Sequence, residues 1–455
     1  MNRIAGRALI TLLLALVLVA GFSFFIAEFV TQADDWAIFS GSPHVYNGDN
    51  INCGVVVDRE NILLADMQNT RQYSASEALR KSTVHWLGDR YGNISAPAIS
   101  HYAQQIAGFD LVSGVYSYGD ASGVVELTLS GKVQQAALEA MGSYKGTVAV
   151  YNYKTGQLLC AVTTPTYDPD HVPDIENDTT GAFEGLYLNR FTQSTYIPGS
   201  IFKIVTLAAA LETIGDIQER SFPCTGSYEI HGEKVTCEVA HGQQSLKGAF
   251  SNSCNCAFAQ IAIELGGKTL MEYAEKIGVT DRITFDGITT AAGNFEAADA
   301  AINVAWSGVG QYNDQINPCA FLTFMSAVAG NGKPTTPYLV EKITVGSTET
   351  YQAEVQTGKK ILSDATVQVL QEYLRNNVAT HYGDGNFPGL TVCAKTGTAE
   401  VGGEQKPNAM LSGFCADEKY PLAFIVCVED AGYGSAVCIP IASKVLAACK
   451  EVLDS

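Results

Sequence analysis

The chain reads Ile197-Pro198-Gly199-Ser200-Ile201-Phe202-Lys203 at the start of a long apolar run, with a lysine three residues after a serine. The run continues to Leu211 with good helix formers and without another proline or glycine, so we predict a helix from Ser200 to Leu211. Residues three apart share one face of a helix, so Lys203 is placed to contact the Ser200 hydroxyl.

This pair suggests a specific chemistry. The apolar neighbours of Lys203 would remove water from its ammonium, which lowers the pKa of an amine. A neutral lysine can take the proton of a serine, which is otherwise a poor nucleophile. The helix N-terminus also favours negative charge beside Ser200, as the oxyanion of acyl transfer requires. The plain alternative is a serine that caps a core helix and a lysine that extends to water.

The composition is that of a globular protein. The chain has 455 residues, of which 47% are hydrophobic and 16% are charged, so it is long enough for a large core and we expect two domains behind an anchor. The formal net charge of −19 argues against binding to nucleic acid and against adhesion to anionic lipid through a basic face.

The N-terminal region predicts a membrane anchor. Residues 8–30 are almost wholly apolar and long enough for a transmembrane helix. Arg3 and Arg7 precede this helix, so we expect residues 1–7 to form a cytoplasmic tail and the remaining chain to lie outside the cell membrane. The alternative is a cleaved signal peptide, for which the apolar run is long.

The chain has 12 cysteines, and their surroundings divide them into groups. Cys224 and Cys237 flank a polar, hairpin-like segment and could pair as a disulfide in an oxidising compartment. We expect no metal site and no cofactor, because Cys254-Asn255-Cys256 is too tightly spaced and the 7 histidines do not cluster with it. The cysteines expected as small buried hydrophobes are Cys160, Cys393, Cys415, Cys427, Cys438 and Cys449.

The pattern along the chain predicts a stalk and a small non-catalytic pedestal over residues 31–142, followed by a catalytic domain over residues 143–455. We expect an α+β fold in which a central antiparallel sheet is flanked by helices. Predicted hairpins lie at 54–65, 146–162 and 411–428, predicted helices at 76–87, 98–107, 131–142 and 437–452, and single strands at 111–117 and 123–129.

Two further short motifs carry polar groups. Ser253-Cys254-Asn255 opens a predicted helix, where the hydroxyl could relay a proton and the amide could hold a substrate carbonyl. Lys395-Thr396-Gly397-Thr398 follows an apolar stretch, where the glycine would allow a ligand backbone to approach a strand edge. Taken alone, the first could be an ordinary helix cap and the second an edge strand with a protective lysine.

Taken together, the motifs S-x-x-K, S-x-N and K-T-G in this order resemble those of penicillin-binding proteins and serine β-lactamases. The chain most resembles the class B penicillin-binding proteins, which are monofunctional D,D-transpeptidases of peptidoglycan synthesis. The similarity is strongest from about residue 143 to 430, and looser over 54–58 and 71–73. Further landmarks are Leu188-Asn189-Arg190, Gly156 to Pro169, His241-Gly242 and Gly308-Val309-Gly310-Gln311.

The resemblance implies a role for each motif residue. Ser200 would attack the penultimate D-alanine of a stem peptide, and Lys203 would be its base. Ser253 would pass a proton to the leaving amine, while Lys395 would tune this network. Further implied roles are peptide binding by Asn255 and Gly397, carboxylate binding by Thr396 and Thr398, and an oxyanion hole formed by the N–H groups of Ser200 and Thr398.

The resemblance also implies partners and leaves alternatives open. The partners would be D-Ala-D-Ala stem peptides, β-lactams as covalent inhibitors, the membrane, and a polytopic glycosyltransferase of the division or elongation machinery. A D,D-carboxypeptidase would need no change in these motifs. A β-lactamase is disfavoured because no Glu-x-x-Leu-Asn segment lies between the second and third motifs. A β-lactam receptor is disfavoured because residues 1–7 are too short to signal. An idle scaffold is disfavoured because Ser200 and Lys203 are both present.

Overall fold

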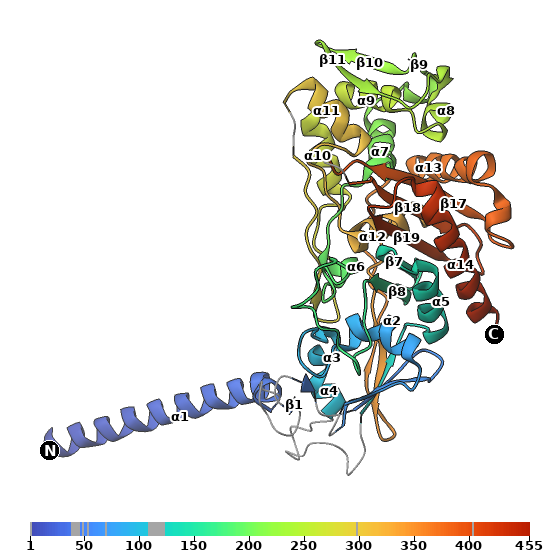
Figure 1. Ribbon diagram of the computed structural model, residues 1–455. Helices are drawn as coiled ribbons and strands as arrows, with labels where there is room; N and C mark the ends of the chain where they lie inside the picture. The colour runs from blue at the N-terminus through green and yellow to red at the C-terminus, as the bar shows by residue number, and fades with distance from the viewer. Residues whose placement is uncertain are drawn as a thin grey trace.

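The structure is a computed structural model of the 455-residue chain. It describes residues 2–37, 46–47, 50–51, 54–68, 71–107, 123–296, 299–402 and 405–455. The predicted strand at 111–117 lies outside the described residues, as do 38–45, 48–49 and 52–53 of the expected stalk. The expected α+β architecture is confirmed (Figure 1).

The centre of the molecule is a five-stranded antiparallel sheet in the order β17-β18-β19-β7-β8. The first and last parts of the catalytic region meet here, because β19 pairs with β7 along its whole length. The hairpins predicted at 146–162 and 411–428 are confirmed. The strands are β7 (Lys145–Asn152), β8 (Leu158–Thr164), β17 (Val392–Ala399), β18 (Asn408–Cys415) and β19 (Leu422–Glu429).

Helices cover both faces of this sheet, because its strands are apolar on both sides. Val148 and Val150 of β7 pack in the cluster beneath α14 (Gly434–Asp454) and α5 (Gly131–Met141). Ala149 and Tyr151 point the other way, into the cluster that holds α12 (Pro318–Ala329). The alternation follows from the two-residue period of a strand. The prediction that six of the cysteines are buried is confirmed, because all six are buried in the structure.

A helical layer lies above the β17 edge of the sheet and carries two small two-stranded sheets (Figure 1). The predicted helix after Ser200 forms its core, where it packs against α9, α10 and α13. The elements of this layer are α7 (Lys203–Thr213), β9 (Ser221–Cys224), β10 (Ser227–Ile230), β11 (Glu233–Thr236), β12 (Gly242–Ser245), α8 (Leu246–Ser251), α9 (Asn255–Leu265), α10 (Gly267–Lys276), α11 (Ala301–Val309) and α13 (Asp364–Asn377).

A second sheet, of six strands, lies at the other end of the molecule in the order β16-β15-β6-β3-β4-β5. Two of its strands come from residues 340–352, so this sheet is built from both sides of the boundary expected at residue 142. The helix predicted over 98–107 is observed as two short helices that meet at Tyr102. The elements are β3 (Val55–Val57), β4 (Leu63–Asp66), β5 (Gln72–Tyr73), α2 (Glu77–Leu87), α3 (Pro97–His101), α4 (Ala103–Ala107), β6 (Gly123–Leu127), β15 (Val340–Val345) and β16 (Thr348–Gln352).

The first helix, α1 (Asn2–Ala37), extends away from the body, at the end opposite the β9–β11 hairpins (Figure 1). It includes the expected span of residues 8–30. The stretch Arg3–Gln32 is long and apolar enough to cross a membrane, and none of its most apolar part is buried against the protein.

The central sheet predicts a large cost for removing one of its aromatic side chains. Phe424 on β19 is fully buried, and it packs against Gly413 of β18, where a side chain would come within 2.9 Å of the ring. We expect Phe424→Ala to lower the free energy of unfolding by about 3–5 kcal/mol, because the ring leaves a cavity behind. Urea unfolding of the full chain in detergent measures this change.

The matched control is Leu63→Ala on β4, where the side chain is 45% exposed. This variant should change the free energy of unfolding by no more than about 0.5 kcal/mol. Equal effects of the two variants would contradict the central position of the five-stranded sheet.

Candidate active site

Ser200 lies in a tight 3-10 turn, η1 (Gly199–Phe202), which leads directly into α7. The predicted helix is therefore confirmed, with its first turn wound more tightly than expected. Gly199 has a φ of +54°, and a Cβ there would stand 2.7 Å from the Thr398 carbonyl oxygen. The glycine thus allows the serine turn and strand β17 to touch.

Lys203 is completely buried one turn after Ser200. Its Nζ lies 3.0 Å from Ser200 Oγ and 3.2 Å from Ser253 Oγ. It donates hydrogen bonds of 2.7 Å to the Ser253 carbonyl and 2.7 Å to Asn255 Oδ1. The alternative in which this lysine extends to water is therefore wrong.

Burial lowers the pKa of Lys203 to about 8. In its neutral form this amine has two N–H groups and one lone pair. The Ser253 carbonyl and Asn255 Oδ1 can only accept, so they occupy the two N–H groups. The lone pair is left for a hydroxyl proton, and Ser200 Oγ lies within hydrogen-bond distance of it.

Lys395 on β17 forms the other side of the same network. Its side chain is buried, and its Nζ donates to Ser253 Oγ at 3.0 Å and to the Thr396 carbonyl at 3.0 Å. Burial, together with the charge of Lys203, holds the pKa of Lys395 well below its ordinary value. Ser253 Oγ therefore lies between two buried amines, which is the position required of a proton relay.

Ser253 and Asn255 form the entrance to α9. Ser253 has a φ of +52°, a left-handed conformation that is uncommon for a residue with a side chain. The Asn255 amide is held at both ends, because its Oδ1 accepts from Lys203 and its Nδ2 donates to the Thr236 carbonyl at 2.8 Å. The hairpin that contains Thr236 thus supports the S-x-N segment.

Strand β17 lies at the edge of the five-stranded sheet, as predicted, and faces the Ser200 turn. A Cβ at Gly397 would stand 2.9 Å from the Pro198 carbonyl and 3.3 Å from the Ile201 nitrogen, so this contact requires glycine. Thr396 and Thr398 lie two residues apart on the strand, and both line a cleft of about 440 Å³.

The structure brings all the predicted site residues together. Ser200, Ser253 and Asn255 line the cleft with Thr396 and Thr398, and the two lysines lie directly behind the serines. Other residues that line this cleft include Thr236, Cys237, Glu238, Val239, His241, Trp306, Gln311 and Tyr433.

Sequence reasoning missed Tyr382, which ends a π-helical turn (Val378–Tyr382) after α13. Its hydroxyl accepts the Thr396 backbone N–H at 3.0 Å and lies 3.0 Å from Thr396 Oγ1. Part of the ring reaches the surface, but burial of the hydroxyl raises the pKa of Tyr382, so the hydroxyl stays protonated. No motif marks this tyrosine, because its role depends on where the turn ends.

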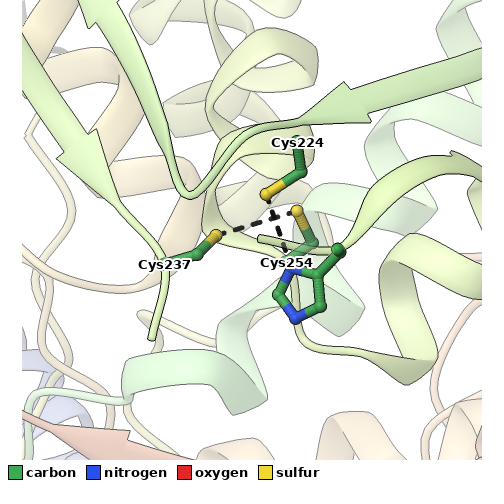
Figure 2. A group of neighbouring side chains, drawn as sticks. Cys224, Cys237 and Cys254 are labelled. Atoms are coloured by element: carbon green, nitrogen blue, oxygen red, sulfur yellow. Dashed lines mark hydrogen bonds between the residues drawn. The ribbon is translucent and has the colours of Figure 1, made fainter. Parts of the chain in front are cut away.

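The expectation that no histidine clusters with the cysteines is wrong. The ligand atoms of Cys224, Cys237, His241 and Cys254 all lie within 4.8 Å of one another (Figure 2). Cys224 and Cys237 are free thiols in the structure, so the disulfide considered between them is not formed there. Spacing along the chain did not reveal the cluster, because the β10–β11 hairpin brings its parts together from four separate positions.

Comparison with known proteins identifies relatives of this site and fold. Residues 146–447 match the family model described as "Penicillin binding protein transpeptidase domain". The peptidoglycan D,D-transpeptidase PbpA of Mycobacterium tuberculosis is 27% identical over 366 residues, which cover 72% of this chain and 73% of that protein.

Solved structures show the same fold. A ceftriaxone acyl-enzyme complex of penicillin-binding protein A from M. tuberculosis matches with a TM-score of 0.76 at 23% identity, covering 87% of this chain and 98% of that one. The D,D-transpeptidase domain of a peptidoglycan glycosyltransferase from Eggerthella lenta matches with a TM-score of 0.75 at 25% identity, covering 88% of this chain and 98% of that one.

The Tyr382 contact predicts a measurable effect on stability. Tyr382→Phe would leave the Thr396 N–H without its acceptor, which we expect to lower the free energy of unfolding by about 1–3 kcal/mol. Tyr144→Phe is the control, because Tyr144 is exposed. Denaturant unfolding of both variants tests this, and an unchanged Tyr382→Phe would show that its hydroxyl does not support β17.

Proposed function

The chain belongs to the penicillin-binding protein transpeptidase family, and we propose that it crosslinks peptidoglycan stem peptides through an acyl-enzyme on Ser200. As a class B member it is a serine-type D,D-transpeptidase. The observation that carries the residue assignments is the contact of the buried Lys203 amine with the hydroxyl of Ser200.

Acylation begins with proton transfer. The neutral form of Lys203, made more accessible because burial lowers the pKa to about 8, takes the proton from Ser200 as Oγ attacks the carbonyl carbon of the penultimate D-alanine. The backbone N–H groups of Ser200 and Thr398 stabilise the oxyanion that forms. As the C–N bond breaks, the terminal D-alanine receives a proton through Ser253, which lies between Lys203 and Lys395, and leaves as the free amino acid.

The edge of β17 binds the donor peptide. The backbone between Lys395 and Thr398 pairs with the stem as an added strand, while Gly397 lets this strand lie directly against the serine turn. Thr396 and Thr398 bind the terminal carboxylate, with Thr396 positioned by Tyr382. The Asn255 Nδ2 has a second N–H besides the one that it donates to the Thr236 carbonyl, and this N–H donates to the peptide carbonyl.

Deacylation uses an amine from a neighbouring stem peptide. This amine attacks the ester carbonyl, the Ser200 Oγ leaves and recovers its proton, and the new amide is the crosslink. A β-lactam is attacked by the same serine, and its ring opens without a leaving group that can diffuse away. It therefore remains as a stable acyl-enzyme.

The placement in the cell is part of the same proposal. Helix α1 stays as a single-pass anchor in the cell membrane, with residues 1–7 in the cytoplasm and the cleft on the extracytoplasmic side. Residues 31–142 act as stalk and pedestal, and residues 143–455 as the transpeptidase domain. A polytopic glycosyltransferase of the division or elongation machinery supplies the glycan strands that carry the stems.

The reaction products test this function. Full-length protein incubated with a pentapeptide stem donor and an acceptor amine should give a crosslinked dimer and free D-alanine, measured by mass spectrometry. Ser200→Ala should give neither product, whereas Ser100→Ala, at an exposed position outside the cleft, should act like the unchanged protein. Tetrapeptide alone, without dimer, would contradict the transpeptidase and indicate a carboxypeptidase.

The base assignment predicts a pH dependence. The neutral form of Lys203 is the active one and its pKa is lowered to about 8, so acylation should rise about tenfold per pH unit below pH 8 and level off above it. The measurement is the second-order rate constant for labelling by a fluorescent penicillin between about pH 6 and 9.5.

Lys203→Arg provides the control for this profile. Arginine keeps the positive charge but stays protonated, so labelling should fall by about 10³-fold or more at every pH. A profile that is flat across pH 8, or near-normal labelling of Lys203→Arg, would remove Lys203 as the base.

A further inference from the structure

Four potential metal ligands lie directly behind the S-x-N segment, and the proposed reaction uses none of them. Cys224 ends β9, Cys237 follows β11, His241 precedes β12, and Cys254 stands between Ser253 and Asn255. Figure 2 shows the sulfurs of Cys224, Cys237 and Cys254 turned toward one another. Cys224 and Cys254 are buried, and Cys237 and His241 are half-buried.

Two of the distances between ligand atoms match those of a tetrahedral zinc site, and all four ligand atoms lie within 4.8 Å of one another. Zn–S bonds of about 2.3 Å and Zn–N bonds of about 2.0–2.1 Å place two sulfurs about 3.8 Å apart and a sulfur and a nitrogen about 3.5 Å apart. The Sγ atoms of Cys237 and Cys254 are 3.8 Å apart. The Cys224 Sγ and His241 Nδ1 are 3.5 Å apart.

We propose that Cys224, Cys237, His241 and Cys254 form a structural Zn²⁺ site. Three thiolates and one imidazole form a closed tetrahedral set of the kind that selects zinc. Binding displaces the protons of the three thiols to solvent, so no oxidant or reductant is required. The ion has no role in the acyl transfer itself, although Cys237 and His241 also line the cleft beside Ser200.

Cys256 is close to this site but outside it. Its Sγ lies 3.5 Å from the Cys237 sulfur, and its backbone N–H donates to that sulfur at 3.4 Å. A backbone N–H that points at a sulfur stabilises a thiolate ligand and fixes its orientation. Cys256 is therefore a supporting residue, and its thiol offers a matched control.

The ion would hold the active-site loop in place. Cys254 separates Ser253, whose backbone is in a left-handed conformation, from Asn255, which contacts Lys203. Cys237 follows Thr236, whose carbonyl anchors the Asn255 amide. Zinc at the four ligands therefore joins β9, the β10–β11 hairpin and the start of α9 at the point where the S-x-N groups are positioned.

The main competitor is a disulfide among the same cysteines. The 3.8 Å between the Cys237 and Cys254 sulfurs is well beyond the bonded distance of about 2.04 Å. A disulfide would also use two of the three cysteines and leave the third with His241. The arrangement of all four groups around one point favours a metal ion.

Metal analysis of full-length protein purified in detergent tests the proposal. We expect one zinc per chain that survives desalting, and at least a five-fold loss of zinc in Cys224→Ser, Cys237→Ser and His241→Ala. Cys256→Ala should keep its zinc. Zinc that is substoichiometric and lost on desalting, a disulfide found by thiol counting, or loss of zinc in Cys256→Ala with retention in Cys237→Ser would each overturn the proposed site.

A second measurement does not depend on how the variants fold. Unchanged protein loaded with Co²⁺ in place of zinc should show thiolate-to-cobalt charge-transfer absorption and tetrahedral d–d bands, and X-ray absorption of the zinc form should give three sulfurs and one nitrogen. An oxygen-rich or six-coordinate ion would contradict the site. Ser200→Ala should bind the same amount of zinc as the unchanged protein. The test of the zinc site is therefore independent of the transpeptidase activity.

Discussion

The rest of the site depends on a lysine that has no access to water. Shifting the Lys203 pKa from 10.5 to about 8 corresponds to about 3 kcal/mol against the charged amine. This cost favours the neutral amine, whose lone pair can face Ser200 Oγ. The carbonyl oxygens of Ser253 and of the Asn255 side chain accept its two N–H groups. A stable fold with an unfavourable residue in its core is a common property of catalytic sites.

The fold meets this constraint by joining segments that are far apart in the sequence. The central sheet closes β19 on β7, which fixes β17 as an edge strand, and the glycines at 199 and 397 let that edge touch the serine turn. The helical layer supplies Lys203 from α7 and Asn255 from α9. Because Lys203 is contacted from the serine turn, from Ser253 and from α9, its dry environment exists only in the complete fold.

The sequence predicted the parts that follow from local pattern. Alternating and apolar runs located the strands of the central sheet, and the order of three motifs located Ser200, Lys203, Ser253 and Lys395. It did not predict that residues 340–352 join the six-stranded sheet, that Tyr382 supports Thr396, or that His241 lies among the cysteines. These features arise where a turn ends or where a hairpin folds back, and no residue spacing encodes such tertiary contacts.

Location of the covalent bond tests the central claim most directly. The full-length chain should be acylated with penicillin, digested, and its modified peptide sequenced by tandem mass spectrometry. The account predicts one adduct per chain, carried by Ser200 in the tryptic peptide Phe191–Lys203. An adduct on Ser253, on Cys237 or on any other side chain, with Ser200 unmodified, would contradict it.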